Sequence, residues 1–191
     1  MTALRSEFDS LTEVVIPNTV ETIGANAFYG RSKLATLNLS GVKTVGDQAF
    51  YNCSSLKNLD LTSAETIGAA AFTNTTALKV AEMPSLTKVG ASAFQNSGIE
   101  TLVLGSIEVI DSYAFANTNI KSLTIPSSLS TYTYDETWPE INENGDEEEI
   151  KGKKTLRIMN GAFQNLVNLT KFDVESTNAA FFADERGALY A

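Results

Sequence analysis

The 191-residue sequence contains no histidine and a single cysteine, Cys53. Without histidine, the chain lacks the commonest general base and the commonest metal ligand of proteins. With one cysteine it cannot form an internal disulfide, so cysteine content leaves the redox compartment open. The sequence also has no glycine-rich phosphate loop, no cysteine cluster and no serine-centred catalytic motif. These absences predict a protein that is not an enzyme and that holds neither a cofactor nor a metal ion.

Basic residues are scarce as well, with 14 Lys and Arg against 23 Asp and Glu and a formal net charge of −9. Such a surface repels phosphate backbones and anionic lipids, so nucleic acid is not expected as a partner. No apolar run reaches the roughly 18–20 residues that span a bilayer. The N-terminal stretch MTALRSEFDSL lacks a hydrophobic signal core. We expect either a cytosolic protein or a chain that begins after a removed signal.

What the sequence does contain is an internal repeat of about 22 residues, marked by an Ala-Phe pair. The phenylalanines of this pair are Phe28, Phe50, Phe72, Phe94, Phe115 and Phe163. An isoleucine or valine stands five residues before each phenylalanine. Two residues after it stands Gly30, Asn52, Asn74, Asn96, Asn117 or Asn165. Because glycine and asparagine tolerate positive φ, this last column predicts a tight turn in every repeat.

Each turn is followed by a second motif of the form L-x-x-L-x-L, which also opens the array as LTEVVI at residues 11–16. Its last four residues alternate between apolar and polar, as in a strand with one buried face. One repeat cannot bury its leucines and phenylalanine alone, but stacked repeats can. The pattern therefore predicts a solenoid with seven motif strands in one parallel ribbon. Two of the repeats are shorter than the others, and we expect each of them to lack one residue at the turn.

Together the two motifs resemble the BspA-type class of leucine-rich repeats, which joins L-x-x-I-x-I-P strands to I-G-x-x-A-F-x-x-C-x-x-L. VGDQAFYNCSSL at 45–56 and LTEVVIPNTVETIGANAF at 11–28 carry the resemblance, which covers roughly residues 11–174. It implies a right-handed, curved solenoid with a parallel β-sheet on its concave face and little helix, as one domain over residues 1–191. Residues 175–191 resemble a segment that often flanks such arrays, and we expect either a cap or a junction to a longer protein.

The resemblance also carries expectations about function. Members of this class are mostly surface or secreted proteins of bacteria and some protozoa, and they look like adhesion and binding modules. We therefore expect a non-enzymatic module that binds a protein or glycan partner. The alternative is a structural spacer or stalk within a longer surface protein. The resemblance also places Cys53 in a buried column, which favours core packing over a role as a nucleophile.

An insertion of about 26 residues, at about 130–154, separates the last two repeats. It holds eight acidic residues, three lysines and a strong turn signal, Asn144-Gly145. We expect a β-hairpin or a partly ordered loop. It is either a tolerated surface insertion, a calcium site whose carboxylate spacing does not match the EF-hand, or a binding loop that uses Tyr132, Tyr134 and Trp138.

The outward positions of the predicted strands form the other candidate surface. This surface is small, polar and mildly acidic, without aromatic anchors, and it is either an ordinary solvated face or a ligand platform. The candidate ligand-binding residues on it are Asn38, Asn58, Asp60, Val80, Glu82, Thr101, Val103, Ser122 and Thr124.

Overall fold

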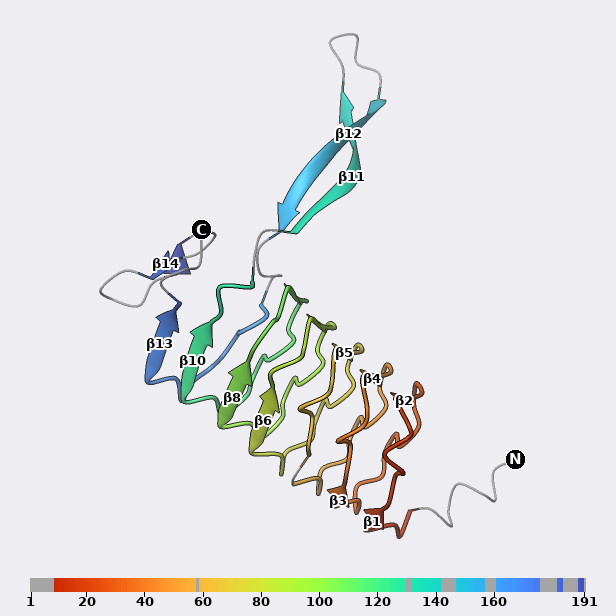
Figure 1. The fold of residues 1–191 in the computed structure, drawn as a ribbon. Coiled ribbons are helices and arrows are strands. Elements are labelled where there is room, and N and C mark those ends of the chain that lie inside the picture. Colours follow the sequence, from red (N-terminus) through yellow and green to blue (C-terminus); the bar gives the residue numbers. More distant parts are fainter. Residues whose placement is uncertain are drawn as a thin grey trace.

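The computed structural model describes residues 9–57, 59–129, 132–141, 147–156, 161–175, 182–183 and 189–190. In these residues the chain winds into a parallel-strand solenoid in which each repeat forms one coil (Figure 1). The described residues contain no helix. They therefore contain no helix that is long and apolar enough to cross a bilayer. The sequence prediction of a leucine-rich-repeat type of solenoid is confirmed.

One parallel sheet is built from the isoleucine and valine column five residues before each phenylalanine. Its two-residue strands pair in the order of the chain, and each begins with an exposed or half-buried residue and ends with a buried one. The strands are β2 (Thr22–Ile23), β4 (Thr44–Val45), β5 (Thr66–Ile67), β7 (Lys88–Val89) and β9 (Val109–Ile110). Sequence analysis identified this column but did not predict that it forms a sheet of its own.

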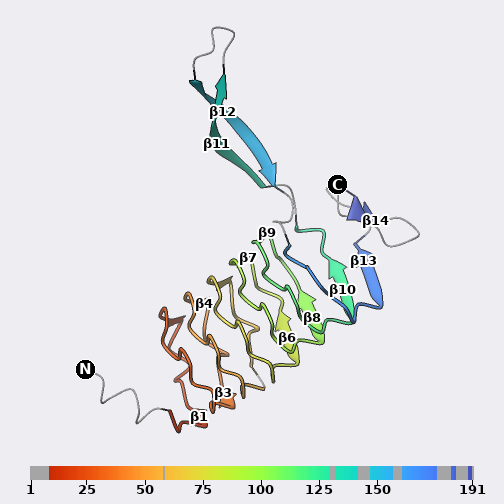
Figure 2. The ribbon, with the colours of Figure 1, turned by 180° about the vertical axis from the view of Figure 1, so that it is seen from behind.

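The L-x-x-L-x-L motifs form the strands on another side of the coils (Figures 1 and 2). Four of them pair in the order β13-β10-β8-β6, and β1 pairs with β3. Their bounds are β1 (Glu13–Val14), β3 (Thr36–Leu37), β6 (Val80–Met83), β8 (Thr101–Leu104), β10 (Ser122–Ile125) and β13 (Lys171–Val174).

The prediction of one unbroken ribbon of seven motif strands is wrong at the third coil. No described residue of its motif, at 56–61, is in a strand, so the ribbon is interrupted between β3 and β6. The Asp60 side chain accepts hydrogen bonds from the Thr62 backbone N–H and hydroxyl, at 3.1 and 2.6 Å. This local bonding forms a turn after Asp60, as is common for aspartate, and the corresponding bond from the Ser40 N–H to Asn38 follows β3 in the second coil.

The interior is a column of stacked phenylalanines, one from each coil. Neighbouring ring centroids are 5.1–5.6 Å apart and the rings are within 10° of parallel. Phe50, Phe72, Phe94 and Phe115 are fully buried. Phe28 and Phe163, at the two ends of the column, are only half-buried. The insertion does not interrupt the column, because Phe115 stacks directly on Phe163.

The turns around each phenylalanine are linked to the next coil by backbone hydrogen bonds. The Phe72 N–H, for example, donates to the Ala93 carbonyl at 2.7 Å, and Phe28, Phe50 and Phe94 do the same in their coils. The predicted positive φ is present at all six positions of the glycine and asparagine column, with values of 57–73°.

A second column of positive φ lies four residues earlier, and sequence analysis did not predict it. It consists of Asn26, Gln48, Ala70, Ser92, Tyr113 and Gly161. The left-handed conformation costs a non-glycine residue roughly 1–2 kcal/mol. In the first four of these residues it directs the N–H at a carbonyl of the next coil, at 2.8–2.9 Å. We infer that these bonds between coils offset the cost.

Asparagines of the turn column form a side-chain ladder along the solenoid. Each of the later four donates its Nδ2–H to the Oδ1 of the asparagine one coil earlier. The donor–acceptor pairs are Asn74–Asn52, Asn96–Asn74, Asn117–Asn96 and Asn165–Asn117, at 2.7–3.0 Å. Since the last step bridges the insertion, the prediction that length changes are absorbed outside the core is confirmed.

The insertion itself forms an antiparallel hairpin of β11 (Tyr132–Ile141) and β12 (Glu147–Leu156), as predicted. Its strands extend away from the solenoid (Figure 1). In the C-terminal segment, β14 (Phe182–Ala183) pairs antiparallel with β15 (Leu189–Tyr190). Whether residues 175–191 act as a cap stays a prediction.

The close approach of the coils leads to a testable prediction at the glycine of I-G-x-x-A-F. A Cβ built on Gly46 would lie 2.7 Å from the Ala25 nitrogen of the preceding coil, whereas a Cβ on Gly24 meets nothing within 4 Å. We expect Gly46→Ala to lower the free energy of unfolding by about 1–3 kcal/mol, as overpacking does. Gly24→Ala, the matched control, should change it by less than about 0.5 kcal/mol.

Urea denaturation followed by circular dichroism measures both variants. Equal stabilities of Gly46→Ala and Gly24→Ala would show that the glycine column is not required for the spacing of the coils.

Candidate functional site

The exposed side chains of the L-x-x-L-x-L strands form one surface, which we call the strand face. In β6 and β10, exposed residues alternate strictly with buried ones. The described candidates from the sequence are all exposed there: Asn38, Asp60, Val80, Glu82, Thr101, Val103, Ser122 and Thr124. Asn58 lies outside the described residues. The strand register places these residues in two rows, because Val80 pairs with Thr101, which in turn pairs with Ser122.

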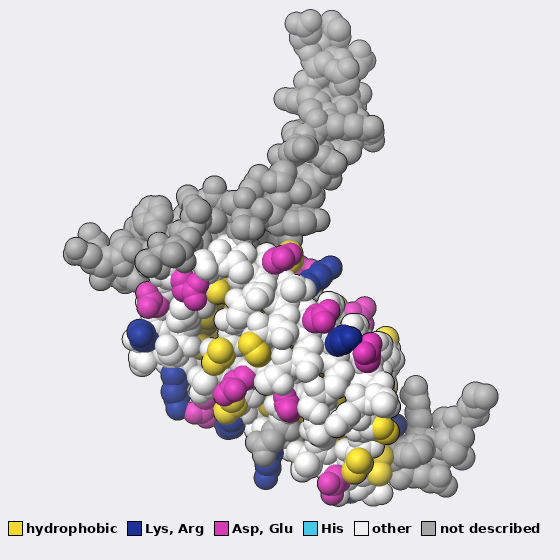
Figure 3. Space-filling view, viewed as in Figure 1, with side chains coloured by type: hydrophobic (Ala, Val, Ile, Leu, Met, Phe, Trp, Pro, Cys, Tyr) yellow, Lys and Arg dark blue, Asp and Glu magenta, His cyan; other side chains and the backbone are white. Residues whose placement is uncertain are grey.

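The strand face mixes uncharged polar, charged and apolar side chains. Figure 3 shows acidic, basic and hydrophobic side chains scattered over the molecule in this view. The exposed apolar side chains of the face are Val15, at 83% exposure, and Val80 and Val103, at 46% each. No aromatic side chain occupies an outward position of β1, β3, β6, β8, β10 or β13. The face therefore lacks the large aromatic anchors that dominate tight protein interfaces.

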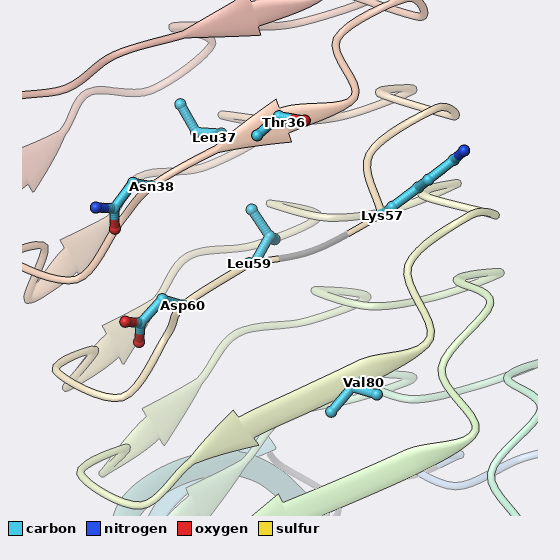
Figure 4. A pocket seen from close by; sticks show the side chains of 7 residues that line it. All are labelled: Thr36, Leu37, Asn38, Lys57, Leu59, Asp60 and Val80. Carbon is cyan, nitrogen blue, oxygen red and sulfur yellow. The ribbon is translucent and has the colours of Figure 1, made fainter.

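A depression lies on the strand face where the ribbon is interrupted. It has a volume of about 480 Å³ and is lined by Thr36, Leu37, Asn38, Lys57, Leu59, Asp60 and Val80 (Figure 4). A smaller hollow of about 310 Å³ shares Leu59, Asp60 and Val80 with it and reaches Glu82. We call this combined feature the third-coil depression. Sequence analysis did not predict it, because the third motif alternates like its neighbours.

The polar side chains of the third-coil depression are held by local hydrogen bonds. Asn38 Oδ1 accepts the Ser40 N–H at 2.9 Å, and Asp60 Oδ1 accepts the Thr62 N–H at 3.1 Å. Each side chain is therefore oriented by one of its polar atoms. Among the described residues, no hydrogen bond is made by the Asn38 Nδ2 donor or the Asp60 Oδ2 acceptor.

Lysines gather along the edge of the strand face where its strands begin (Figure 3). They include Lys57, Lys79, Lys121 and Lys171, all of which are exposed. Between two of them lies Glu100, whose carboxylate is 3.0 Å from Lys79 Nζ and 2.5 Å from Lys121 Nζ. These hydrogen bonds and charges, those of Lys121 first, hold the pKa of the Glu100 carboxyl below its ordinary value.

The aromatic candidates of the insertion, Tyr132, Tyr134 and Trp138, are on β11. Their side chains lie outside the described residues. Because the hairpin extends away from the solenoid, its strands do not run across the strand face (Figure 1).

Sequence analysis missed a pair of stacked tyrosines beside the positive-φ turns of the first two coils. Tyr29 and Tyr51 stack with ring centroids 5.0 Å apart, and Tyr29 is 45% exposed. A hollow of about 690 Å³ beside them is lined by Asp9, Asn26, Tyr29, Gly30, Arg31 and Gln48, and Arg31 forms an ion pair with Asp9. The sequence does indicate this stacking, because the two tyrosines are 22 residues apart and each directly follows a phenylalanine of the stacked column.

Cys53 is fully buried, as predicted, and its thiol contacts the Phe28 carbonyl oxygen at 3.1 Å. Burial raises the pKa of the Cys53 thiol to about 11. Reactive cysteines instead have a lowered pKa and some exposure. The described residues also contain no group of three acidic, cysteine or histidine side chains that could hold a metal ion.

The environment of Cys53 predicts a chemically inert thiol in the folded protein. At pH 8, three units below this pKa, only about one thiol in a thousand is ionised, and the thiolate is the nucleophile. We expect almost no labelling by iodoacetamide over an hour at pH 8, and complete labelling in urea. Mass spectrometry measures both, and rapid labelling of the folded protein would contradict the buried placement.

The sequence matches the model of the BspA type leucine rich repeat region, with six copies over residues 5–121 and 65–184. A similar solved structure is a leucine rich cell surface protein from Faecalibacterium prausnitzii A2-165. It is 25% identical with a TM-score of 0.68, and the match covers 94% of this chain and 44% of that one. A search of curated proteins found no match.

Two further structures show the same fold at lower identity. The pneumococcal vaccine antigen PcpA is 22% identical with a TM-score of 0.53, and the match covers 94% of this chain and 34% of that one. A leucine-rich repeat protein from Bacteroides ovatus ATCC 8483 is 19% identical with a TM-score of 0.53, and the match covers 88% of this chain and 50% of that one. The chain thus spans a third to a half of the length of these proteins. On the match to the family model, the chain belongs to the BspA-type leucine-rich repeat family.

Proposed function

We propose that this chain is a non-enzymatic binding module of a surface or secreted protein and that it presents its strand face to a protein or glycan partner. The family and a similar structure described as a cell surface protein support the location. The observation that carries the binding role is the third-coil depression, where oriented polar groups lie beside the exposed Val80 and the half-buried Leu59.

The architecture supports this role because the strand face is built on a rigid interior. The stacked phenylalanines and the backbone bonds between coils fix the position of each outward side chain. Groups on regular strands, such as Val80, Thr101 and Ser122, are positioned more accurately than groups on loops, such as Asp60. The face can therefore offer polar contacts at a small ordering cost.

The proposed contacts include outward residues on both sides of the depression. On the strand face they are Asn38, Asn58, Asp60, Val80, Glu82, Thr101, Val103, Ser122 and Thr124. The hairpin is a second proposed contact, through Tyr132, Tyr134 and Trp138, because aromatic residues are enriched in interfaces and these stand among charged residues in the sequence.

The alternative is a spacer or stalk that holds other parts of a longer surface protein. The lack of aromatic side chains at outward strand positions favours it, since tight interfaces are enriched in such residues. A spacer requires only the stacked core, and its strand face would be an ordinary solvated surface.

A binding screen against extracellular matrix proteins and a glycan array tests the proposal. The samples are the full chain, a variant lacking residues 132–156, and the strand-face variant Thr101→Arg. Thr22→Arg is the matched control, because Thr22 is also an exposed strand threonine but belongs to the five-stranded sheet. We expect saturable binding that Thr101→Arg weakens at least about tenfold by placing a large side chain on the strand face, and that Thr22→Arg leaves unchanged.

If only the variant that lacks residues 132–156 loses binding, the site lies on the hairpin and not on the strand face. No saturable binding by any folded sample would overturn the binding role and favour the spacer.

A further inference from the structure

The third-coil depression has opposite charges at its two ends. Figure 4 shows Lys57 at one end and Asp60, beside Asn38, at the other, with Leu59 between them. Because Lys57 and Asp60 are three apart in the sequence, their Cα atoms are separated by at most about 10 Å. The depression is therefore polarised along the direction of the coil.

The fourth coil repeats this polarity. Lys79 stands immediately before β6, and Glu82 is the third residue of that strand. Both are exposed, and Val80 lies between them at the edge of the depression. Neighbouring strands of a sheet are about 4.8 Å apart. Lys57 thus gives the depression a basic side, to which Lys79 adds less because its Nζ is 3.0 Å from the Glu100 carboxylate, and Asp60 and Glu82 give the depression an acidic side.

The centre of the depression is apolar but has no ring. Leu59 is half-buried and Val80 is 46% exposed, and no aromatic residue is among the described lining residues. Pyranose rings are usually held by stacking on an aromatic face, so this composition disfavours a sugar. A polypeptide segment needs only small apolar contacts and charged groups at matching positions.

We propose that the third-coil depression binds an extended segment of a partner protein that carries one acidic and one basic side chain about 10 Å apart. The acidic side chain lies beside Lys57 and Lys79, and the basic one lies beside Asp60 and Glu82. In a polyproline II segment this distance separates residues i and i+3, which project from the same side. The inference rests on the proposed function and specifies its partner class.

The opposite charges set which segments bind and in which orientation. Complementary charges across an interface mainly provide specificity and faster association, while like charges disfavour the wrong partner. Because Lys57 and Asp60 are both exposed, the preference should weaken as salt rises.

Synthetic peptides in a proline-rich host sequence test the inference directly. One set carries Glu and Lys at positions i and i+3 in either order, a second carries two Glu, and a third carries two Lys. Fluorescence anisotropy at about 20 mM salt should show the folded chain binding a mixed-charge peptide about fivefold more tightly than either like-charge peptide, since exposed ion pairs contribute modestly.

Charge reversal at either end should change this preference in a defined direction. Lys57→Glu makes the basic end more acidic and should shift the preference to the two-Lys peptide. Asp60→Lys should shift it to the two-Glu peptide, and Asp60→Asn, which keeps an oxygen acceptor for Thr62, should reduce the preference for mixed charge. Asp173→Lys is the control for net charge, because Asp173 lies in the same row on β13, away from the depression.

Equal binding of the three peptide sets would overturn the inference, as would a shift with Asp173→Lys equal to that with Asp60→Lys. Saturable binding of a glycan or of a protein in the screen, together with no peptide preference, would overturn this inference and leave the proposed function standing. No saturable binding of any peptide, protein or glycan would overturn both.

Discussion

The structure depends on one constraint, which is that every coil must present the same cross-section to the next coil. The phenylalanine rings stack at 5.1–5.6 Å, close to the spacing of hydrogen-bonded strands. Backbone bonds such as Phe72 N–H to the Ala93 carbonyl hold the coils at this distance. A repeat is therefore stable only against a neighbour of the same shape, which is why the sequence restates the I-G-x-x-A-F motif.

The same constraint explains which changes the array tolerates. A hairpin of two ten-residue strands interrupts the chain between Phe115 and Phe163, yet those rings stack and Asn165 still donates to Asn117. The inserted strands lie outside the stacked cross-section, so they do not alter it. At the third coil the strand is lost, but Leu56 and Leu61 remain buried and the phenylalanine column continues. The interior is the same from coil to coil, while the residues of the strand face vary.

Much of the fold could be predicted from the sequence because the repeat aligns residues that share one environment. Local residue chemistry predicts the phenylalanine column, the positive φ from Gly30 to Asn165, exposed positions such as Thr101, and the pairing of β11 with β12 on either side of the turn signal Asn144-Gly145. The second positive-φ column could not be predicted, because Gln48 and Tyr113 carry no preference for that conformation. Bonds to the neighbouring coil impose it. The five-stranded sheet was missed because its two-residue strands are too short to alternate.

The candidate site was predictable only in part. The exposure of Asn38, Asp60 and Val80 follows from alternation, but the depression that joins them depends on the missing third strand. The bond from the Thr62 N–H to Asp60 does not explain that loss, because Asn38 accepts the Ser40 N–H in the same way directly after β3. The stacking of Tyr29 on Tyr51 could be predicted from the repeat alignment, because both residues directly follow a stacked phenylalanine.

The most direct test of this account compares two phenylalanines of the same column. Phe72 is fully buried between two neighbouring rings, whereas Phe28 is half-buried with one ring beside it. In urea denaturation, Phe72→Ala should lower the free energy of unfolding by about 3–5 kcal/mol, as large-to-small changes in a core do. Phe28→Ala should cost clearly less. A loss below about 1 kcal/mol for Phe72→Ala, or an equal loss for both variants, would contradict the claim that stacking between coils holds the solenoid together.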